Sequence, residues 1–225
     1  MSIFKDLINL WKTEDLLSVA WAQSFEMLEL SREIFNQAIK YLRKGENIET
    51  LKALKKRDRE INIFQQEVRR KVMTHYAVAN TTTDIPNGLV LINMVVDIER
   101  IGDYSKNILD LAINYPETIV SEDINADLAI IENEVKSRFD KTIEAIHTQD
   151  TDIAKSLFAG YHEQVTGKSD KLVNQTLSGK HSFGGESKTA AIVLYARYLK
   201  RIGAHLKNIT TTLVNPFDSI GYKIK

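Results

Sequence analysis

Two stretches of this chain, DIERIGDYSKNI at Asp97–Ile108 and YLKRIGAHLKNI at Tyr198–Ile209, are versions of one phrase. When the first stretch is shifted by 101 positions, its Arg-Ile-Gly and Lys-Asn-Ile triplets coincide with those of the second without a gap. A match of this length at one fixed offset predicts an internal repeat.

A second echo lies upstream of each phrase, with DREIN at Asp58–Asn62 and DKLVN at Asp170–Asn174. Each of these short stretches lies on the predicted helix that directly precedes the helix of its repeated phrase, the middle one of three. The two echoes therefore predict two copies of one three-helix unit, at residues 15–118 and 119–225, preceded by a separate segment at 1–14.

Apolar residues recur at helical spacing through most of the chain. One such series is Leu51, Leu54, Ile61, Phe64, Val68 and Val72. Steps of three, four and seven residues favour amphipathic helices, and no segment alternates as a strand does. The pattern predicts an all-α fold of six long helices, at 15–44, 49–78, 85–114, 122–148, 150–178 and 186–214. Short loops between them favour antiparallel neighbours, hence two tandem antiparallel three-helix bundles. Thr83 and Asp84 precede Pro86, a combination typical of a helix start.

Composition excludes several classes of function. The 225 residues carry 30 basic and 30 acidic side chains and no cysteine. Zero net charge argues against a nucleic-acid partner, since such proteins usually show a basic excess. The lack of cysteine excludes disulfides and thiolate metal sites. No stretch reaches the ~20 apolar residues of a membrane span.

The first fourteen residues form an amphipathic segment with Ile3, Phe4, Leu7, Ile8, Leu10 and Trp11 on one helical face. The segment lacks the basic leader and small-residue cleavage site of a signal peptide. Two interpretations stay open. It packs on the bundle as a short helix, or it touches a membrane or a membrane-bound partner.

Oxygen-bearing side chains gather on the first repeat. Glu99 and Asp103 are four residues apart and share a helix face. Asp58 and Asn62 form a similar pair on the preceding helix, which faces them if the two helices are antiparallel. Such oxygen clusters suit hard cations such as Mg, Ca, Mn or Fe. The alternative is a solvated acidic face with Arg100 and Lys106 as intrahelical partners.

The doubled phrase resembles the signature helix of the PhoU-like family of phosphate-uptake regulators, and the resemblance covers about residues 15–215. It implies two copies of a three-helix bundle. It also implies non-catalytic regulation of phosphate transport and signalling from the cytoplasmic side, by contact with a membrane phosphate transporter or a sensor kinase. Several family members bind metal through paired carboxylates on the bundle surface.

Carried over by position, the resemblance implies a metal site of Glu99, Asp103, Asp58 and Asn62 for a divalent or trivalent ion, among Mg, Ca, Mn, Fe and Zn. Asn62 stands where the family more often has a carboxylate. In the second half, the signature carboxylates are replaced by Lys200 and Ala204, and the echo keeps only Asp170 and Asn174. Because an ammonium repels a cation, we expect no metal in the second half.

Two rival functions remain. A di-metal enzyme of the ferritin-like type needs Glu-x-x-His on two helices, and only Glu144–His147 fits that spacing. A metal-free helical interaction module fits the periodicity equally well. The resemblance favours a cytoplasmic regulator, at the inner face of the membrane or free of it. It leaves homo-oligomerisation and peripheral membrane contact open.

Overall fold

A computed structural model describes residues 15–79, 84–115, 117–119, 126–158 and 160–222, and every regular element within these ranges is helical. The first half contains α2 (Leu16–Lys44), α3 (Ile48–Lys56), α4 (Asp58–Ala79) and α5 (Ile85–Asn114). The second half contains α6 (Ala126–Thr148), α7 (Thr151–Ser156), the π-helical η2 (His162–Gly167), α8 (Lys168–Leu177), α9 (Glu186–Thr211) and the 3₁₀-helical η3 (Phe217–Ser219).

The predicted all-α class, with two bundles related by an internal repeat, is confirmed. The predicted amphipathic segment at 1–14 lies outside the described residues. The predicted division of the chain at residue 118 stays a prediction, because most of the residues that join the halves lie outside the described ranges as well.

The middle helix of each half is broken, whereas the sequence predicted it to be continuous. The helix expected over 49–78 is divided at Arg57. Its N–H donates to the Leu54 carbonyl at 3.0 Å, and its carbonyl accepts from the Glu60 N–H at 2.9 Å. These three-residue steps tighten the chain into a 3₁₀-like turn. The helix expected over 150–178 is interrupted at Gly160, where φ is +71°, a conformation that glycine adopts readily.

The start of α5 agrees only in part with its predicted cap. Asp84 holds the N-cap position and Pro86 lies in the first turn. The Asp84 side chain makes no capping hydrogen bond; its Oδ2 lies 2.8 Å from His75 Nε2 on α4. This carboxylate therefore ties α4 to the start of α5 instead of closing the helix end.

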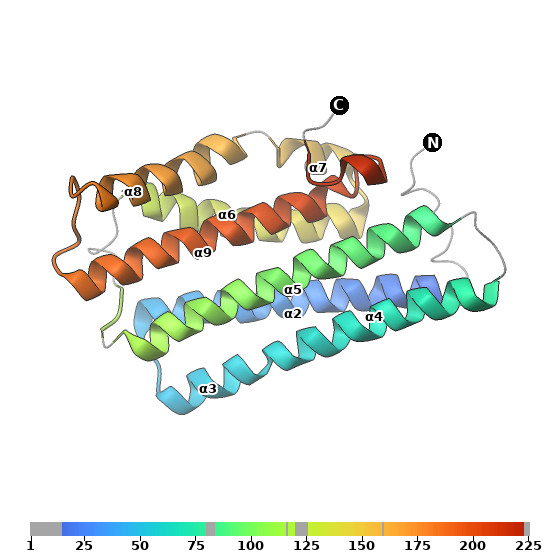
Figure 1. Ribbon diagram of the computed structural model, residues 1–225, viewed down its shortest axis with the longest axis horizontal. Coiled ribbons are helices and arrows are strands. Elements are labelled where there is room, and N and C mark those ends of the chain that lie inside the picture. Colours follow the sequence, from blue (N-terminus) through green and yellow to red (C-terminus); the bar gives the residue numbers. More distant parts are fainter. Residues whose placement is uncertain (1–14, 80–83, 116, 120–125, 159, 223–225) are drawn as a thin grey trace.

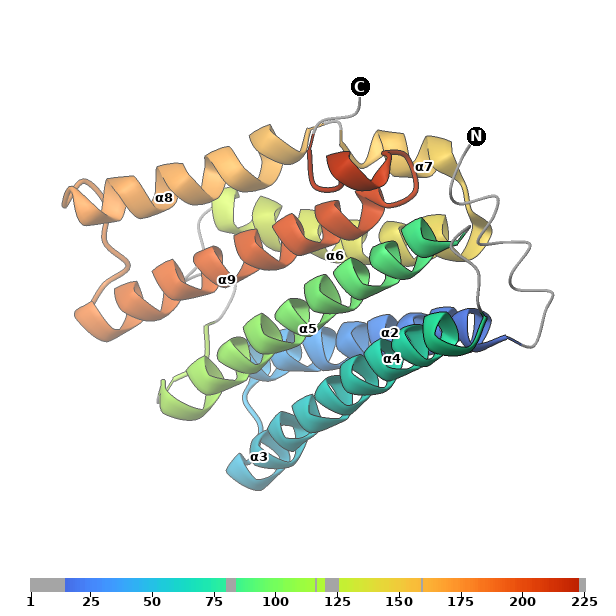
Figure 2. The ribbon, with the colours of Figure 1, turned by 45° about the vertical axis from the view of Figure 1, so that its right-hand side comes forward.

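Helices α5 and α9 lie side by side and antiparallel at the centre of the molecule, with α2 and α4 on one side and α6 and α8 on the other (Figures 1 and 2). The direction is set by two contacts. Asp97 meets His205 at 2.7 Å, while the Tyr104 and Tyr198 ring centroids are 6.1 Å apart. A shift by 101 residues turns one of these pairs into the other, so a pseudo-two-fold axis relates the halves.

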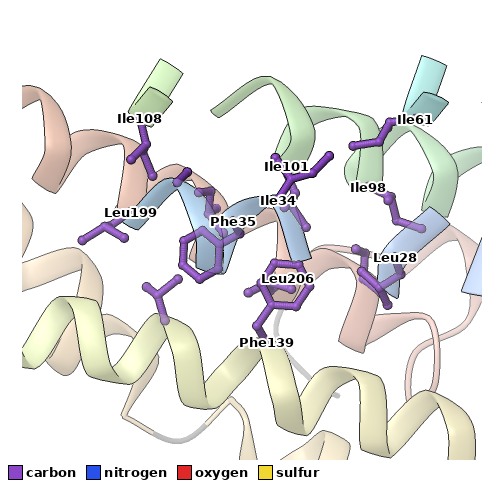
Figure 3. Packing of buried hydrophobic residues seen from close by; sticks show 14 of the residues in the cluster. Leu28, Ile34, Phe35, Ile61, Ile98, Ile101, Ile108, Phe139, Leu199 and Leu206 are labelled. Carbon is purple, nitrogen blue, oxygen red and sulfur yellow. The ribbon is translucent and has the colours of Figure 1, made fainter. Parts of the chain in front are cut away.

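The two bundles share one hydrophobic core. Phe35 of α2 and Phe139 of α6 are both buried, and their ring centroids lie 5.4 Å apart across the junction. Figure 3 shows these rings among Leu199 and Leu206 of α9 and Ile101 of α5. Since apolar burial supplies most of the folding free energy, we expect the halves to unfold together.

None of the helices within the described ranges is long and apolar enough to cross a membrane.

Candidate functional site

Glycine on the repeated phrase brings the middle helix close to it in both halves. A Cβ added at Gly102 would lie 2.8 Å from Ile61 Cδ1 and 3.6 Å from Asp58 Oδ1. A Cβ added at Gly203 would lie 3.2 Å from Tyr161 Cε2 and 3.4 Å from Val165 Cγ1. Close helix approach explains why glycine stands here in spite of its cost of up to about 1 kcal/mol in a helix.

This close approach places Asp58 of α4 beside the carboxylates of α5. Its Oδ2 accepts a hydrogen bond from Lys106 Nζ at 2.7 Å, and the same ammonium donates to Asp103 Oδ1 at 3.0 Å. The side chains of Asp58, Asp103 and Lys106 are 13%, 30% and 28% exposed. We call Asp58, Glu99, Asp103 and Lys106 the carboxylate cluster; its ammonium lies between two of its three acids.

Lys106 is held firmly in its charged form. Burial by itself would lower the pKa of its ammonium, but hydrogen bonds and charge attraction from Asp58 and Asp103 outweigh that effect and raise the pKa. Since opposite charges at this distance favour the ionised form of each partner, Lys106 acts as an internal counter-ion of the cluster.

Glu99 is the least satisfied acid of the cluster. Burial raises the pKa of its carboxyl group, and the neighbouring charge of Asp103 raises it further, against an opposing effect of Arg100. Arg100 Nε lies 3.6 Å from the Glu99 carboxylate, while its NH1 bonds Asp103 at 3.0 Å. A carboxylate in this position gains from any additional positive charge nearby.

Asn62 lies at the edge of the cluster. Its Nδ2 is 3.5 Å from Asp58 Oδ2, at the outer limit of a hydrogen bond. The structure thus brings all four predicted metal-site residues to one face of α4 and α5. Among the described residues, however, no three His, Asp or Glu side chains are arranged to hold a metal ion.

The donor chemistry of the cluster fits a hard cation, with three carboxylates and the amide oxygen of Asn62 available. The observed rotamers instead place Lys106 and Arg100 against these acids, as the solvated-face alternative expected. A metal ion would therefore compete with the Lys106 ammonium for Asp58 and Asp103. Metal binding stays a prediction.

In the second half, Lys200 stands at the position of Glu99 and binds Asp170. Its Nζ lies 2.6 and 2.7 Å from the two carboxylate oxygens, and Arg197 NH1 lies 3.2 Å from Oδ1. Two cations thus flank one carboxylate. These cations would oppose a metal ion at this face, and the expected absence of metal from the second half stays a prediction.

The echo between Asp58 and Asp170 is not a match in space. Gln65 donates to the Val95 carbonyl, and Ser169 donates to the Ala196 carbonyl, which is the equivalent position on α9. A shift of 104 residues relates Gln65 to Ser169. The same shift relates Ile61, which lies against Gly102, to Val165, which lies against Gly203.

With that register, His162 is the counterpart of Asp58, and Asp170 lies about two helical turns further along. The predicted equivalence of Asp58 and Asp170 is therefore wrong. The second middle helix also differs from the first in its break at Gly160 and in its π-helical turn.

The sequence predicts Lys106 only as an intrahelical partner, whereas in the structure it also bonds Asp58 on α4. The repeat marks this position, because both copies of the phrase have lysine there, as Lys106 and Lys207. Lys207 instead donates to the Gly221 carbonyl at 3.2 Å and lies over the Phe158 ring.

The di-metal enzyme gains no support from the geometry. Glu144 and His147 are both exposed, and the His147 ring packs 5.2 Å from that of Phe25. A ferritin-like site needs these side chains to project into the bundle interior. This Glu-x-x-His string is therefore a surface feature.

Comparison with known proteins decides the family. The model of the PhoU domain matches this chain twice, over residues 25–112 and 128–213. The chain belongs to the PhoU domain family. PhoU proteins are known as regulators of phosphate transport. The two matched ranges include the doubled phrase in both copies, so the repeat seen in the sequence is the repeat of the PhoU domain.

Two solved PhoU structures have the same fold. The crystal structure of PhoU from Pseudomonas aeruginosa superposes with a TM-score of 0.72 at 20% identity, covering 88% of this chain and 95% of that one. The phosphate transport system regulatory protein PhoU from Streptococcus pneumoniae superposes with a TM-score of 0.69 at 15% identity, covering 88% and 93%. Curated protein sequences give no significant match to this chain.

Proposed function

We propose that this PhoU protein regulates phosphate uptake and phosphate-responsive signalling without catalysis, by contact with a membrane phosphate transporter or its sensor kinase on the cytoplasmic side. The observation that carries the proposal is the doubled PhoU domain, which occupies most of the chain and places the repeated phrase at the centre of the molecule.

The charge distribution supports a role in contacts. The two halves have one architecture, but their equivalent faces differ in charge. The first presents Glu99 and Asp103, where the second has Lys200 and Ala204. A partner that recognises charge would therefore bind the two faces differently, which gives a pseudo-symmetric molecule a defined orientation.

Co-purification tests this proposal directly. The chain is tagged at its C-terminus, cells are grown with ample phosphate, and membranes are cross-linked and solubilised. We expect subunits of a phosphate transporter or a sensor kinase to be enriched with the tagged chain. Recovery of neither, from cells in which both are expressed, would contradict the proposal.

The proposal includes a cation site at the carboxylate cluster. Asp58, Glu99 and Asp103, with Asn62, would hold a divalent or trivalent ion when the Lys106 ammonium moves aside. The unfavourable environment of the Glu99 carboxylate supports this assignment, because a bound cation would relieve it. The bound ion would supply positive charge at this face. The metal content of Lys106→Gln and Glu99→Lys variants tests this part separately from the partner contact.

A further inference from the structure

One end of the first bundle is strongly basic, although the chain as a whole is neutral. Between residues 40 and 59 there are eight lysines and arginines against three acids. This stretch covers the last turns of α2, all of α3 and the start of α4. Figure 1 shows α3 at the extremity of the molecule, away from the α5–α9 junction. A charged end of this kind attracts anions.

A hollow of about 600 Å³ opens at this end, between α3, the start of α4 and α5. Its volume lies within the range of about 300–1,000 Å³ that is typical of small-molecule sites. Five cationic side chains line it, from Lys52, Lys55, Lys56, Arg59 and Lys106. Only two acids, Glu49 and Asp58, line it as well. We call this feature the basic hollow.

Not every cation of the basic hollow is balanced inside the protein. Lys55 is paired with Asp110, and Lys106 with Asp58 and Asp103. Lys52 reaches Glu49 only at 4.0 Å.

Lys56 and Arg59 are exposed, and neither forms an ion pair or a side-chain hydrogen bond with any residue in the described ranges. Their two charges, together with the weakly paired Lys52, are available to a ligand. Arginine is suited to oxyanions, because its planar fork donates two parallel hydrogen bonds to phosphate or carboxylate oxygens.

We infer that the basic hollow binds a soluble anion with several phosphate groups, such as an oligophosphate. The hollow is concave, with Lys52 and Lys56 on α3 and Arg59 on α4, so one compact ligand with several charges can meet these three cations together. Lys106 lines both the hollow and the carboxylate cluster. An anion in the hollow therefore competes with Asp58 and Asp103 for its ammonium.

Arg70 provides a matched control. It is also an exposed arginine of α4 with no ion pair to a described residue, and it lies eleven positions after Arg59. Eleven residues are about three helical turns, so the two arginines share a face of α4 about 16 Å apart. Arg59→Glu and Arg70→Glu therefore change the net charge equally, but only the first change lies in the basic hollow.

Titration calorimetry with sodium tripolyphosphate, at physiological ionic strength, tests this inference on the full chain. We expect saturable binding that Arg59→Glu weakens by about tenfold or more, while Arg70→Glu leaves it within about twofold. Arg59→Lys should retain part of the affinity. Circular dichroism of each variant serves as the check that it is folded.

Two results would overturn the inference. One is the absence of saturable binding, or equal weakening by Arg59→Glu and Arg70→Glu, which would indicate attraction by overall charge alone. The other is binding to an anionic lipid surface in place of a soluble anion. Vesicles of phosphatidylcholine with and without phosphatidylglycerol are sedimented with each variant. Arg59-dependent binding to the anionic vesicles, without tripolyphosphate binding, would assign the hollow to a membrane surface.

Discussion

Tyr104 and His205 hold the same position in the two repeats, 101 residues apart, and their rings stack on each other with centroids 5.8 Å apart and an interplanar angle of 26°. Since α5 and α9 are antiparallel, equivalent residues on them touch where a two-fold axis passes between the two helices. The halves of this PhoU protein therefore meet face to face through α5 and α9, in the manner of a symmetric dimer joined into one chain.

The shared core leads to a prediction about cooperativity. Phe35 is fully buried against Phe139 of the other half. Phe35→Ala should lower the free energy of unfolding by about 3–5 kcal/mol, the usual cost of truncating a buried phenylalanine. Because the core is continuous, we expect one unfolding transition by circular dichroism and by calorimetry.

Val78→Ala is the control for that measurement, since Val78 is 75% exposed and should change stability by less than about 0.5 kcal/mol. Two separate transitions in the Phe35→Ala variant, with only one shifted, would contradict a shared core.

The close contact at Gly102 gives a second prediction. In Gly102→Ala, the added Cβ would lie 2.8 Å from Ile61 Cδ1, which is fully buried and has little room to move. We expect a net loss of about 1 kcal/mol, because overpacking outweighs the gain in helix propensity.

The Ile61→Val background removes that Cδ1 atom and should cancel the loss from Gly102→Ala. Chemical denaturation of the two single variants and the double variant measures the coupling. Strictly additive effects would mean that another contact fixes the glycine.

Glu99 should make stability depend on pH in a defined direction. Burial, and then the charge of Asp103, raise the pKa of its carboxyl group in the folded protein. The folded chain then favours the protonated form of Glu99. The contribution of Glu99 to the free energy of unfolding is therefore fully present below the pKa that this group has in the unfolded chain. It is lost as the pH rises through the pKa that the group has in the folded chain.

Accordingly, Glu99→Gln should stabilise metal-free protein at pH 7, by less than about 1 kcal/mol, and the gain should vanish near pH 4. Thermal unfolding at the two pH values, in the presence of a chelator, measures it. A gain that is equal at both pH values would show that ionisation of Glu99 is not its cause.

Lys106 sets the prediction for metal binding. Lys106→Gln removes the ammonium between Asp58 and Asp103 and leaves three acids, with Arg100 still paired to Asp103. We expect this variant to bind more Mn²⁺ or Mg²⁺ than the wild type, whereas Glu99→Lys should abolish binding. Elemental analysis after dialysis against each metal gives the ratio of metal to protein.

Lys207→Gln is the matched control, because Lys207 is the repeat equivalent of Lys106 and contacts a carbonyl and an aromatic ring instead of acids. It should leave the metal content unchanged. Equal metal content in wild type, Lys106→Gln and Glu99→Lys would remove the cation site from the account.

The sequence predicted the helices, because apolar periodicity is a local signal, and the repeat, because two similar stretches are visible in it. It predicted that Asp58 faces Glu99 and Asp103 only on the condition that their two helices are antiparallel. It could not predict the break at Arg57, where the helical pattern continues through a 3₁₀-like turn. Nor could it place Asp170 correctly. The second middle helix is interrupted at the left-handed Gly160 and contains a π-helical turn, and neither feature leaves a clear mark in the hydrophobic pattern.

Uptake of radiolabelled phosphate measures the proposed regulation in living cells. Initial rates are compared, at ample and at limiting phosphate, in cells that lack this chain and in cells that carry it again on a plasmid. We predict that loss of the chain changes the rate or its response to external phosphate, and that the full chain restores the original behaviour. Identical rates and identical responses in both strains would contradict a role in the regulation of phosphate transport.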